Sequence, residues 1–73
     1  MNRRANGTAI VSIRKLAGIS QRTLAARVGI APAYLSQIEH SERQPGPEVL
    51  RRLAGELGVP LDAITSPVAE AVA

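Results

Sequence analysis

The stretch that decides the fold is residues 20–39, SQRTLAARVGIAPAYLSQIE, where two short helical patterns are joined by a tight turn. The first pattern begins at Ser20, a residue type that caps helix N-termini, and ends before Gly29, which suits a left-handed C-terminal position. The second begins at Pro32, which fits the first position of a helix. The spacing therefore predicts two helices of about eight residues separated by a turn of three or four residues, the arrangement called a helix-turn-helix.

A helix-turn-helix holds its second helix away from the domain, so that this helix can enter the major groove of DNA. At about 100° per residue, Leu35 and Ile38 point inward and the opposite arc carries small or polar side chains. The predicted base-reading residues on that arc are Pro32, Ala33, Ser36 and Gln37. Small side chains allow a close approach to base edges, and Gln37 can make a bidentate contact to adenine. The alternative is a surface helix without a partner, although such helices more often carry Lys or Glu.

Length and composition are those of one small domain with an aliphatic core. The chain has 73 residues, one aromatic side chain, Tyr34, and no cysteine, which excludes a disulfide scaffold and a cysteine-ligated zinc site. Because we find no secretory signal and no apolar run of about 18 residues, we expect a cytoplasmic protein. We expect neither a cofactor nor an enzyme, because His40 is the only histidine and no paired carboxylates suggest an active site.

Charge is divided unevenly along the chain. The first 38 residues carry six basic side chains and no acid, whereas residues 39–73 carry three arginines and six acids, for a net charge of +3. A first half without carboxylates presents a basic face suited to phosphate backbones. A solvated basic surface without a partner is the alternative.

The chain begins with a polar stretch that leads into a first predicted helix. Residues 1–7 have no apolar period and are predicted to form a flexible basic arm, whose Arg3 and Arg4 can reach a minor groove or phosphates. A disordered, solubilising start is the alternative. Thr8 is the predicted cap of the first helix, which extends to Gly18. The apolar stripe of this helix comprises Ile10, Ile13, Leu16 and Ala17.

Two further predicted helices follow a polar loop, HSERQPGP. The fourth helix begins near Pro47 and ends at Gly58. Its buried stripe comprises Leu50, Leu53, Ala54 and Leu57. A short fifth helix runs from Pro60 to Ile64. We therefore expect three segments: a flexible arm over residues 1–7, a compact all-α domain of five helices over residues 8–65, and a C-terminal tail without fixed structure over residues 66–73.

From about Ile10 to Ile64 the sequence resembles the phage Cro/cI repressor-type helix-turn-helix domains, often called the XRE family. The motifs that carry the resemblance are Gly-Ile-Ser-Gln, Leu-Ala-x-x-Val-Gly-Ile, Tyr-Leu-Ser-Gln-Ile-Glu, Arg-x-Pro and Leu-Gly-Val-Pro, in one order and with the family's spacing. The resemblance implies a lambda-repressor-like fold and a bacterial or phage transcriptional regulator, most often a repressor, that binds double-stranded DNA and so associates with the nucleoid. Two copies on a palindromic site would have half-site centres about 34 Å apart, or a multiple of that.

Roles of individual residues follow from the resemblance for Gln21, His40 and Arg43, and from position in the chain for Arg22 and Tyr34. The predicted phosphate contacts are Gln21, Arg22, Tyr34, His40 and Arg43. Gln21 lies at a helix N-terminus, which is a ready anion site on physical grounds as well, whereas Tyr34 can equally pack its ring and leave only its hydroxyl in water. Arg14 and Glu39 are the expected structural ion pair between the first and third helices.

Three departures from the family pattern affect the third helix. Ala31 stands where Ser or Thr is usual, so the helix loses a side-chain cap. Pro32 occupies a position that often carries a base-reading polar side chain, which leaves direct readout to Ser36 and Gln37 and adds weight to DNA shape. Ser41 replaces the usual Gly after the helix, so the C-terminus is less well closed.

A protein-binding module is the alternative function, for example an antitoxin or a regulatory adaptor with the same fold. The apolar residues available for a protein partner or for self-association are Leu61, Ile64, Val68 and Val72. The alternative for Leu61 and Ile64 is that they close the core. Co-purification with a partner, without retention on DNA, would favour this alternative.

Overall fold

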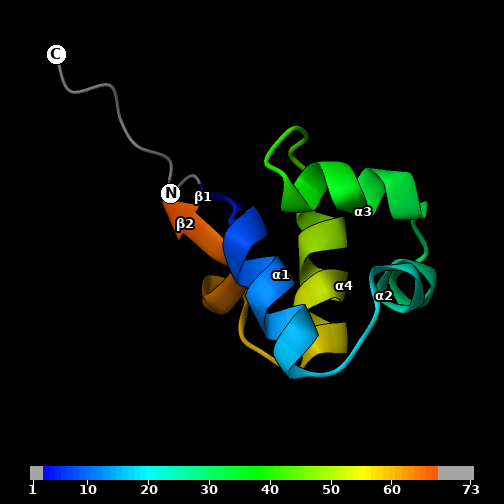
Figure 1. Cartoon of the computed structure of the whole chain (residues 1–73). Helices are drawn as coiled ribbons and strands as arrows, with labels where there is room; N and C mark the ends of the chain where they lie inside the picture. The colour runs from blue at the N-terminus through cyan, green and yellow to red at the C-terminus, as the bar shows by residue number, and fades with distance from the viewer. Residues whose placement is uncertain (1–2, 68–73) are drawn as a thin grey trace, which may run out of the picture.

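The structure, a computed structural model, describes residues 3–67, which form four α-helices, one 3-10 turn and two short strands (Figure 1). The elements are β1 (Arg3–Ala5), α1 (Gly7–Leu16), α2 (Gln21–Val28), α3 (Pro32–Glu39), α4 (Pro47–Leu57), η1 (Leu61–Ile64) and β2 (Thr65–Pro67). The fold is thus mostly helical, but the fifth predicted helix is the single turn η1. Only four residues separate Pro60 from β2. Their turn is closed by a hydrogen bond that spans three residues, as in a 3-10 helix, from Ala63 N to Pro60 O at 2.9 Å.

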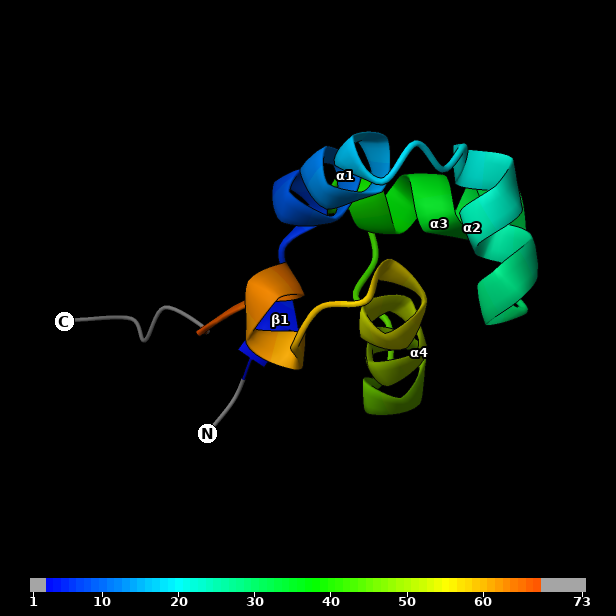
Figure 2. The same ribbon diagram turned by 90° about the horizontal axis from the view of Figure 1, so that it is seen from below.

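The core is aliphatic and lies between α1 and α4, which occupy opposite sides of it (Figure 2). Six large side chains in the core have no exposed surface: Ile10, Leu24, Leu35, Ile38, Leu53 and Ile64. They come from all four α-helices and from η1, so every helix contributes apolar side chains to one core. Within the described residues, no helix is long and apolar enough to cross a membrane.

The first helix differs from its prediction at both ends. Its cap is Asn6, whose Oδ1 accepts a hydrogen bond from Ala9 N at 3.1 Å, and the predicted cap Thr8 is an exposed residue inside the first turn. Leu16 does not join the core but is 88% exposed. At about 100° per residue, Leu16 is turned about 120° from Ile10, whereas Arg14 is turned only about 40° and takes the buried position.

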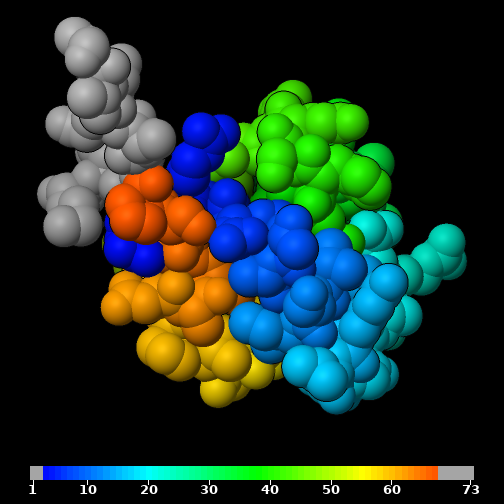
Figure 3. Space-filling view, turned by 60° about the vertical axis from the view of Figure 1, so that its left-hand side comes forward, coloured from blue at the N-terminus to red at the C-terminus, as the bar shows by residue number. Residues whose placement is uncertain are grey.

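The N-terminal segment is not the free arm that the sequence predicts for residues 1–7. Residues 3–5 form β1, which pairs antiparallel with β2 in the register Arg3↔Pro67, Arg4↔Ser66 and Ala5↔Thr65. We call these two strands the β clasp. Figure 3 shows the dark blue N-terminal residues beside the orange residues of β2 on one flank of the molecule. A strand of three residues is too short to produce a period in the sequence, and its pairing partner lies about 60 residues away, which is why local pattern did not indicate it.

The β clasp is held by side chains as well as by its backbone. Arg3 Nε donates to Thr65 Oγ1 at 2.7 Å and Arg3 Nη2 donates to Thr65 O at 3.0 Å. Asn6 adds a backbone bond to Ile64 O at 2.8 Å and a side-chain bond to Ser66 Oγ at 3.1 Å. Residues Ser66 and Pro67, predicted to begin a tail without structure, therefore belong to the fold, and the rest of that tail, residues 68–73, lies outside the described residues.

Candidate nucleic-acid interface

The helix-turn-helix is formed by α2, a short turn and α3. Ser20 Oγ accepts from Thr23 N at 3.0 Å and caps α2, as its sequence position predicts. Gly29 ends α2 in the left-handed conformation, with φ of 85°, and its amide bonds Ala25 O at 2.9 Å. The next helix begins at Pro32 without a side-chain cap, because Ala31 has no acceptor to offer. A side-chain cap and a left-handed glycine are thus present in α2, whereas α3 begins without a side-chain cap.

The third helix has one buried face and one outward face. Leu35, Ile38 and Glu39 are buried. The four predicted base-reading residues lie on the outward side: Pro32 and Ala33 are exposed, and Ser36 and Gln37 are half-buried. Figure 1 shows α3 at one edge of the molecule, with the other helices on one side of it. The arrangement leaves a face of small side chains with one carboxamide, which can approach another surface closely.

A buried polar network ties α1, α2 and α3 together. Arg14 Nε donates to Glu39 Oε2 at 2.8 Å and Arg14 Nη2 donates to Glu39 Oε1 at 3.3 Å, the two side chains that the sequence pairs. The side chain of Glu39 is only 2% exposed and that of Arg14 only 11% exposed. The remaining nitrogen of the guanidinium, Nη1, bonds Ile19 O at 3.0 Å. A fully hydrogen-bonded pair of this kind offsets the desolvation of both charges.

Gln21, predicted to contact a phosphate, is the third member of this network. Its Nε2 donates to Glu39 Oε1 at 2.9 Å, and the residue is half-buried at the start of α2. An amide nitrogen carries two hydrogens, so one N–H of Gln21 remains for another acceptor. Glu39 accepts only, which fixes the orientation of the carboxamide. The network therefore holds the carboxamide of Gln21 at the N-terminus of α2, with one N–H left to donate, and it also anchors α3 through Glu39.

The loop after α3 carries a stacked pair. The guanidinium carbon of Arg43 lies 5.5 Å from the centre of the Tyr34 ring, within the range of a cation–π contact. Tyr34 is half-buried and packs against the core. The ring of Tyr34 is thus packed, with Arg43 above it, and a phosphate contact of its hydroxyl stays a prediction. Arg43 itself is exposed, so its remaining N–H groups face solvent.

His40 and Ser41 form the C-terminus of α3. His40 Nδ1 lies 2.7 Å from Ser36 O, and since a carbonyl only accepts, this ring nitrogen carries the proton. Ser41 has φ of 62°, in the left-handed region that favours glycine. Its amide and that of Glu42 nevertheless bond the last turn, to Ile38 O at 3.1 Å and Gln37 O at 2.8 Å. The helix end is closed by these bonds at the cost of a strained serine.

The arginines predicted to contact DNA are not all available to a partner. Arg22 is exposed on α2, and Arg4 is exposed on β1. Arg3 is half-buried and directed to Thr65, with Asp62 at 3.9 Å, so the predicted arm pair is divided between the two sides of a strand. A strand alternates its side chains, which places Arg3 inward and Arg4 outward.

Sequence reasoning missed Gln44. Its Oε1 accepts from Ala5 N at 2.9 Å and so links the loop after α3 to the β clasp. No local pattern indicates such a bond, because its partner is a backbone amide 39 positions away. The cap Asn6 was detectable, since Asn is as good an N-cap as Thr and it precedes Gly7 directly.

Comparison with known proteins agrees with this geometry. The family profile HTH_3, described as helix-turn-helix, matches residues 10–64. The chain is 40% identical over 58 residues to an uncharacterised HTH-type transcriptional regulator found in two strains of Mycobacterium tuberculosis, a match that covers 80% of this chain and 41% of the relative. The chain thus spans about two fifths of the length of these relatives.

Two solved structures bound to DNA are similar in both sequence and fold. The P22 c2 repressor in complex with a synthetic operator is 34% identical, with a TM-score of 0.75, over 80% of this chain and 88% of the repressor chain. SinR, described as a master regulator for biofilm formation, was solved with DNA and is also 34% identical, with a TM-score of 0.71, over 75% of this chain and 89% of that one. By the extent of the profile match and by these likenesses, the chain belongs to the HTH_3 helix-turn-helix family of Cro/cI-type domains.

Proposed function

We propose that this chain is the DNA-binding domain of a transcriptional regulator and that it represses by occupying a promoter. The observation that carries the proposal is the outward face of α3, whose side chains are small or polar while Leu35, Ile38 and Glu39 hold the helix from behind. Such a face fits the major groove, into which the second helix of a helix-turn-helix is placed. The DNA complexes of the P22 c2 repressor and of SinR support the same use.

Base reading is assigned to the outward face of α3. Gln37 is the side chain with the donor and acceptor needed for a bidentate contact to adenine, worth about 1–3 kcal/mol of discrimination. Ser36 adds a hydroxyl, and Pro32 and Ala33 allow a close approach. Because these two small residues offer no side-chain hydrogen bond, DNA shape carries part of the specificity.

Affinity is assigned to the surrounding donors and positive charges. The phosphate contacts in this proposal are Gln21, Arg22, Tyr34, His40 and Arg43, with Arg4 on the outer side of β1. Stacking on Tyr34 holds the guanidinium of Arg43 in place, which lowers the entropy lost when it binds a phosphate. Backbone contacts of this kind position the protein, whereas base contacts specify the sequence.

A titration of DNA at several salt concentrations tests the proposal. We expect Kd to rise steeply with salt, because bound phosphates release counterions. Arg22→Ala should weaken all duplexes alike and lower the salt slope by about one, whereas Gln37→Ala should relax sequence preference. Lys15→Ala is the matched control, since Lys15 is an exposed cation in the last turn of α1 that is not among the proposed contacts. Absence of salt-dependent binding to any duplex would contradict the proposal.

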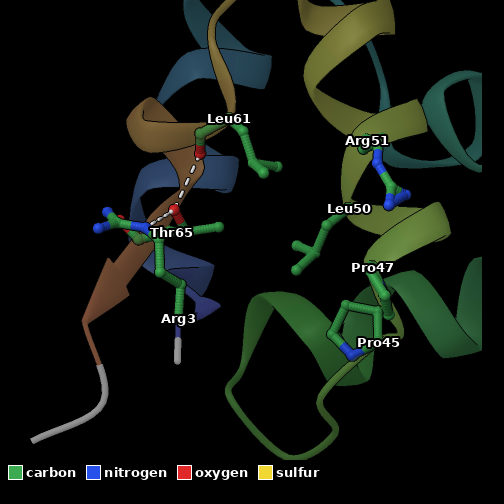
Figure 4. A pocket seen from close by; sticks show the side chains of 7 residues that line it. All are labelled: Arg3, Pro45, Pro47, Leu50, Arg51, Leu61 and Thr65. Carbon is green, nitrogen blue, oxygen red and sulfur yellow. Dashed lines mark hydrogen bonds between the residues drawn. The ribbon is translucent and has the colours of Figure 1, made fainter. Parts of the chain in front are cut away.

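We also propose that two copies bind together, through the groove between α4 and η1. The groove has a volume of about 390 Å³. Figure 4 shows Leu50 of α4 and Leu61 of η1 pointing toward each other across it, with Pro45 below and Arg51 at the rim. Leu61 is 38% exposed, whereas Ile64 has no exposed surface and closes the core, which is the second of the two roles left open for it. The other two predicted residues, Val68 and Val72, lie outside the described residues.

Charge complementarity supports a second copy as the occupant of the groove. Arg51 lines the α4 side of the groove. Asp62 follows Leu61 outside the lining, with a side chain that is 84% exposed and a carboxylate 3.9 Å from Arg3 Nε. In a two-fold interface every contact between two different residues is made twice, once in each direction. A contact of Arg51 with the partner's Asp62 would therefore occur on both sides of the axis. Leu61→Glu should abolish cooperative binding to a palindrome, as measured by the steepness of the binding curve, and leave binding to a single half-site unchanged. Cooperativity that survives Leu61→Glu would contradict this arrangement.

A further inference from the structure

The β clasp is joined by a hydrogen bond to the loop that follows α3, although its strands lie outside the residues that the family profile matches. The profile spans residues 10–64, whereas β1 covers residues 3–5 and β2 covers residues 65–67. Two contacts connect the clasp side of the molecule to α3 and its following loop: Gly7 packs against the carbonyl groups of Ile38 and Glu39, and Gln44 bonds Ala5. The second contact reaches the loop that carries Arg43.

Gln44 supplies the hydrogen bond that the outer edge of β1 needs. Asn6 N bonds Ile64 O, and since antiparallel residues alternate between bonded and non-bonded pairs, Ala5 N points away from β2. Ala5 is only 5% exposed, so its amide requires a partner within the protein. Gln44 Oε1 is that partner at 2.9 Å, although Gln44 is otherwise an exposed loop residue.

The loop is held on both sides of Arg43, by α3 on one side and by Gln44 on the other. On the α3 side, Glu42 N and Arg43 N bond Gln37 O at 2.8 and 3.3 Å. On the other side, Gln44 is bonded to β1 and Pro45 is buried. Between these two anchors the guanidinium of Arg43 lies over the Tyr34 ring at 5.5 Å. The backbone position of Arg43 therefore depends on α3 and on the β clasp together.

We propose that Gln44 is a positioning residue for DNA binding, through which the β clasp holds Arg43 where it meets a phosphate. The inference rests on the proposed DNA-binding function. It assigns to the β clasp a role in DNA affinity that is separate from the proposed phosphate contact of Arg4, because the clasp acts through the loop that carries Arg43. Gln44 acts through Arg43, so removing its acceptor should remove the contribution of Arg43 to binding.

A double-mutant cycle tests this dependence. The variants are Gln44→Leu, which keeps the size of the side chain but lacks the acceptor, Arg43→Ala, and the two together. The probe is a 30-base-pair duplex of mixed sequence, because a phosphate contact does not depend on the bases. Fluorescence anisotropy gives Kd and its salt slope at a temperature at which circular dichroism shows every variant folded.

We expect Gln44→Leu to lower the salt slope by about 0.9 and to weaken binding about eightfold at 0.1 M salt, the effect of one lost phosphate contact. Arg43→Ala should have the same effect, and the double variant should bind no more weakly than Arg43→Ala alone. An unchanged slope in Gln44→Leu, or effects that multiply in the double variant, would overturn the inference. If the unmodified protein shows no salt-dependent binding at all, the proposed function fails instead.

Two measurements on the free protein complete the test. In Gln44→Leu, the amide of Ala5 should exchange faster with solvent, and the ring resonances of Tyr34 should shift as Arg43 leaves the ring. Gln44→Glu retains the acceptor and should restore both signals, although its charge lowers DNA affinity. Ring resonances that stay unchanged in Gln44→Leu would show that Arg43 is held without Gln44. Should Gln44→Leu not fold, Gln44→Asn, whose side chain is one methylene shorter, provides the same comparison.

Discussion

The two helices of the helix-turn-helix have eight residues each but are stabilised in different ways. The second helix carries its own signals at both ends, a Ser20 cap and Gly29 in the left-handed conformation. The third helix has neither: Ala31 provides no cap, and the left-handed position after the helix is occupied by Ser41. Its stability therefore depends on what packs behind it. A helix whose outer face is reserved for another molecule can be held from the inside by tertiary contacts instead of by caps.

The largest expected effect is loss of the buried pair behind α3. Glu39→Ala removes the acceptor of two bonds from Arg14 and one from Gln21, and leaves the guanidinium buried without its counter-charge. We expect a loss of about 3–5 kcal/mol in the free energy of unfolding. At about 0.05–0.15 kcal/mol per residue, a domain of this size has about 4–11 kcal/mol in total. Urea denaturation followed by circular dichroism measures the loss.

Replacing both members of the pair provides the control. Arg14→Met combined with Glu39→Leu leaves no uncompensated charge and should recover most of the stability that Glu39→Ala loses. If Glu39→Ala costs less than about 1 kcal/mol, the pair does not hold α3, and the proposed contrast between the two helices is wrong.

The next effect concerns the close approach of α1 to the last turn of α3. A Cβ on Gly7 would overlap the carbonyl group of Glu39 and would lie 2.7 Å from Ile38 O. Because the neighbouring atoms are backbone, the helices must separate, and we expect Gly7→Ala to cost about 1–3 kcal/mol. Thermal denaturation measures it.

Gly55→Ala is the matched control for Gly7→Ala. It is the same substitution in α4, at a site where the added Cβ meets nothing within 4 Å beyond the backbone of its own helix. It should stabilise the protein by about 0.4–1 kcal/mol, because alanine restricts the unfolded chain and favours the helix. Equal effects of the two substitutions would mean that α1 and α3 can move apart freely.

A smaller loss is expected at the cap of α2. Ser20→Ala removes the acceptor for Thr23 N and should lower stability by about 1 kcal/mol. Ser12→Ala, at an exposed position inside α1, is the control and should change stability by less than about 0.5 kcal/mol. A neutral Ser20→Ala would show that α2, like α3, is held mainly by its packing.

The converse substitution should stabilise α3. Ala31 already has the extended backbone of an N-cap, with φ of −70° and ψ of 143°, and lacks only the acceptor. Ala31→Ser should therefore raise the free energy of unfolding by about 0.5–1 kcal/mol, whereas Ala33→Ser, inside the helix, should not. Since α3 is the proposed recognition helix, stability is measured without DNA. A gain at Ala33 equal to that at Ala31 would contradict capping as the cause.

The sequence predicts the parts of this molecule whose causes are local. Ser20, Gly29, Pro32 and Pro47 mark helix ends by their own chemistry, and the apolar spacing of α2, α3 and α4 indicates their buried faces. The resemblance to Cro/cI-type domains, and not the spacing, pointed to Arg14 and Glu39. The roles of individual residues in DNA binding stay predictions.

The remaining features depend on contacts between distant residues. The β clasp pairs residues at the two ends of the described chain, and the bond from Ala5 to Gln44 joins a strand to a loop. The prediction that Leu16 belongs to the buried stripe of the first helix was wrong for another reason. Its position at the end of a helix satisfied a loose apolar period, but its direction around the helix axis points it to solvent, where it is 88% exposed.

The smallest expected effect tests the other end of α3. At φ of 62° the Cβ of Ser41 is sterically strained, and glycine has no Cβ. Ser41→Gly should therefore relieve strain of about 1 kcal/mol. Glycine also makes the unfolded chain more flexible, which cancels part of the gain and leaves about 0.5 kcal/mol. Gly58→Ser is the reverse substitution at the end of α4, where φ is 69°, and should destabilise. If Ser41→Gly instead destabilises the protein, the serine side chain contributes a contact at this turn, and α3 is better closed at its C-terminus than its backbone indicates.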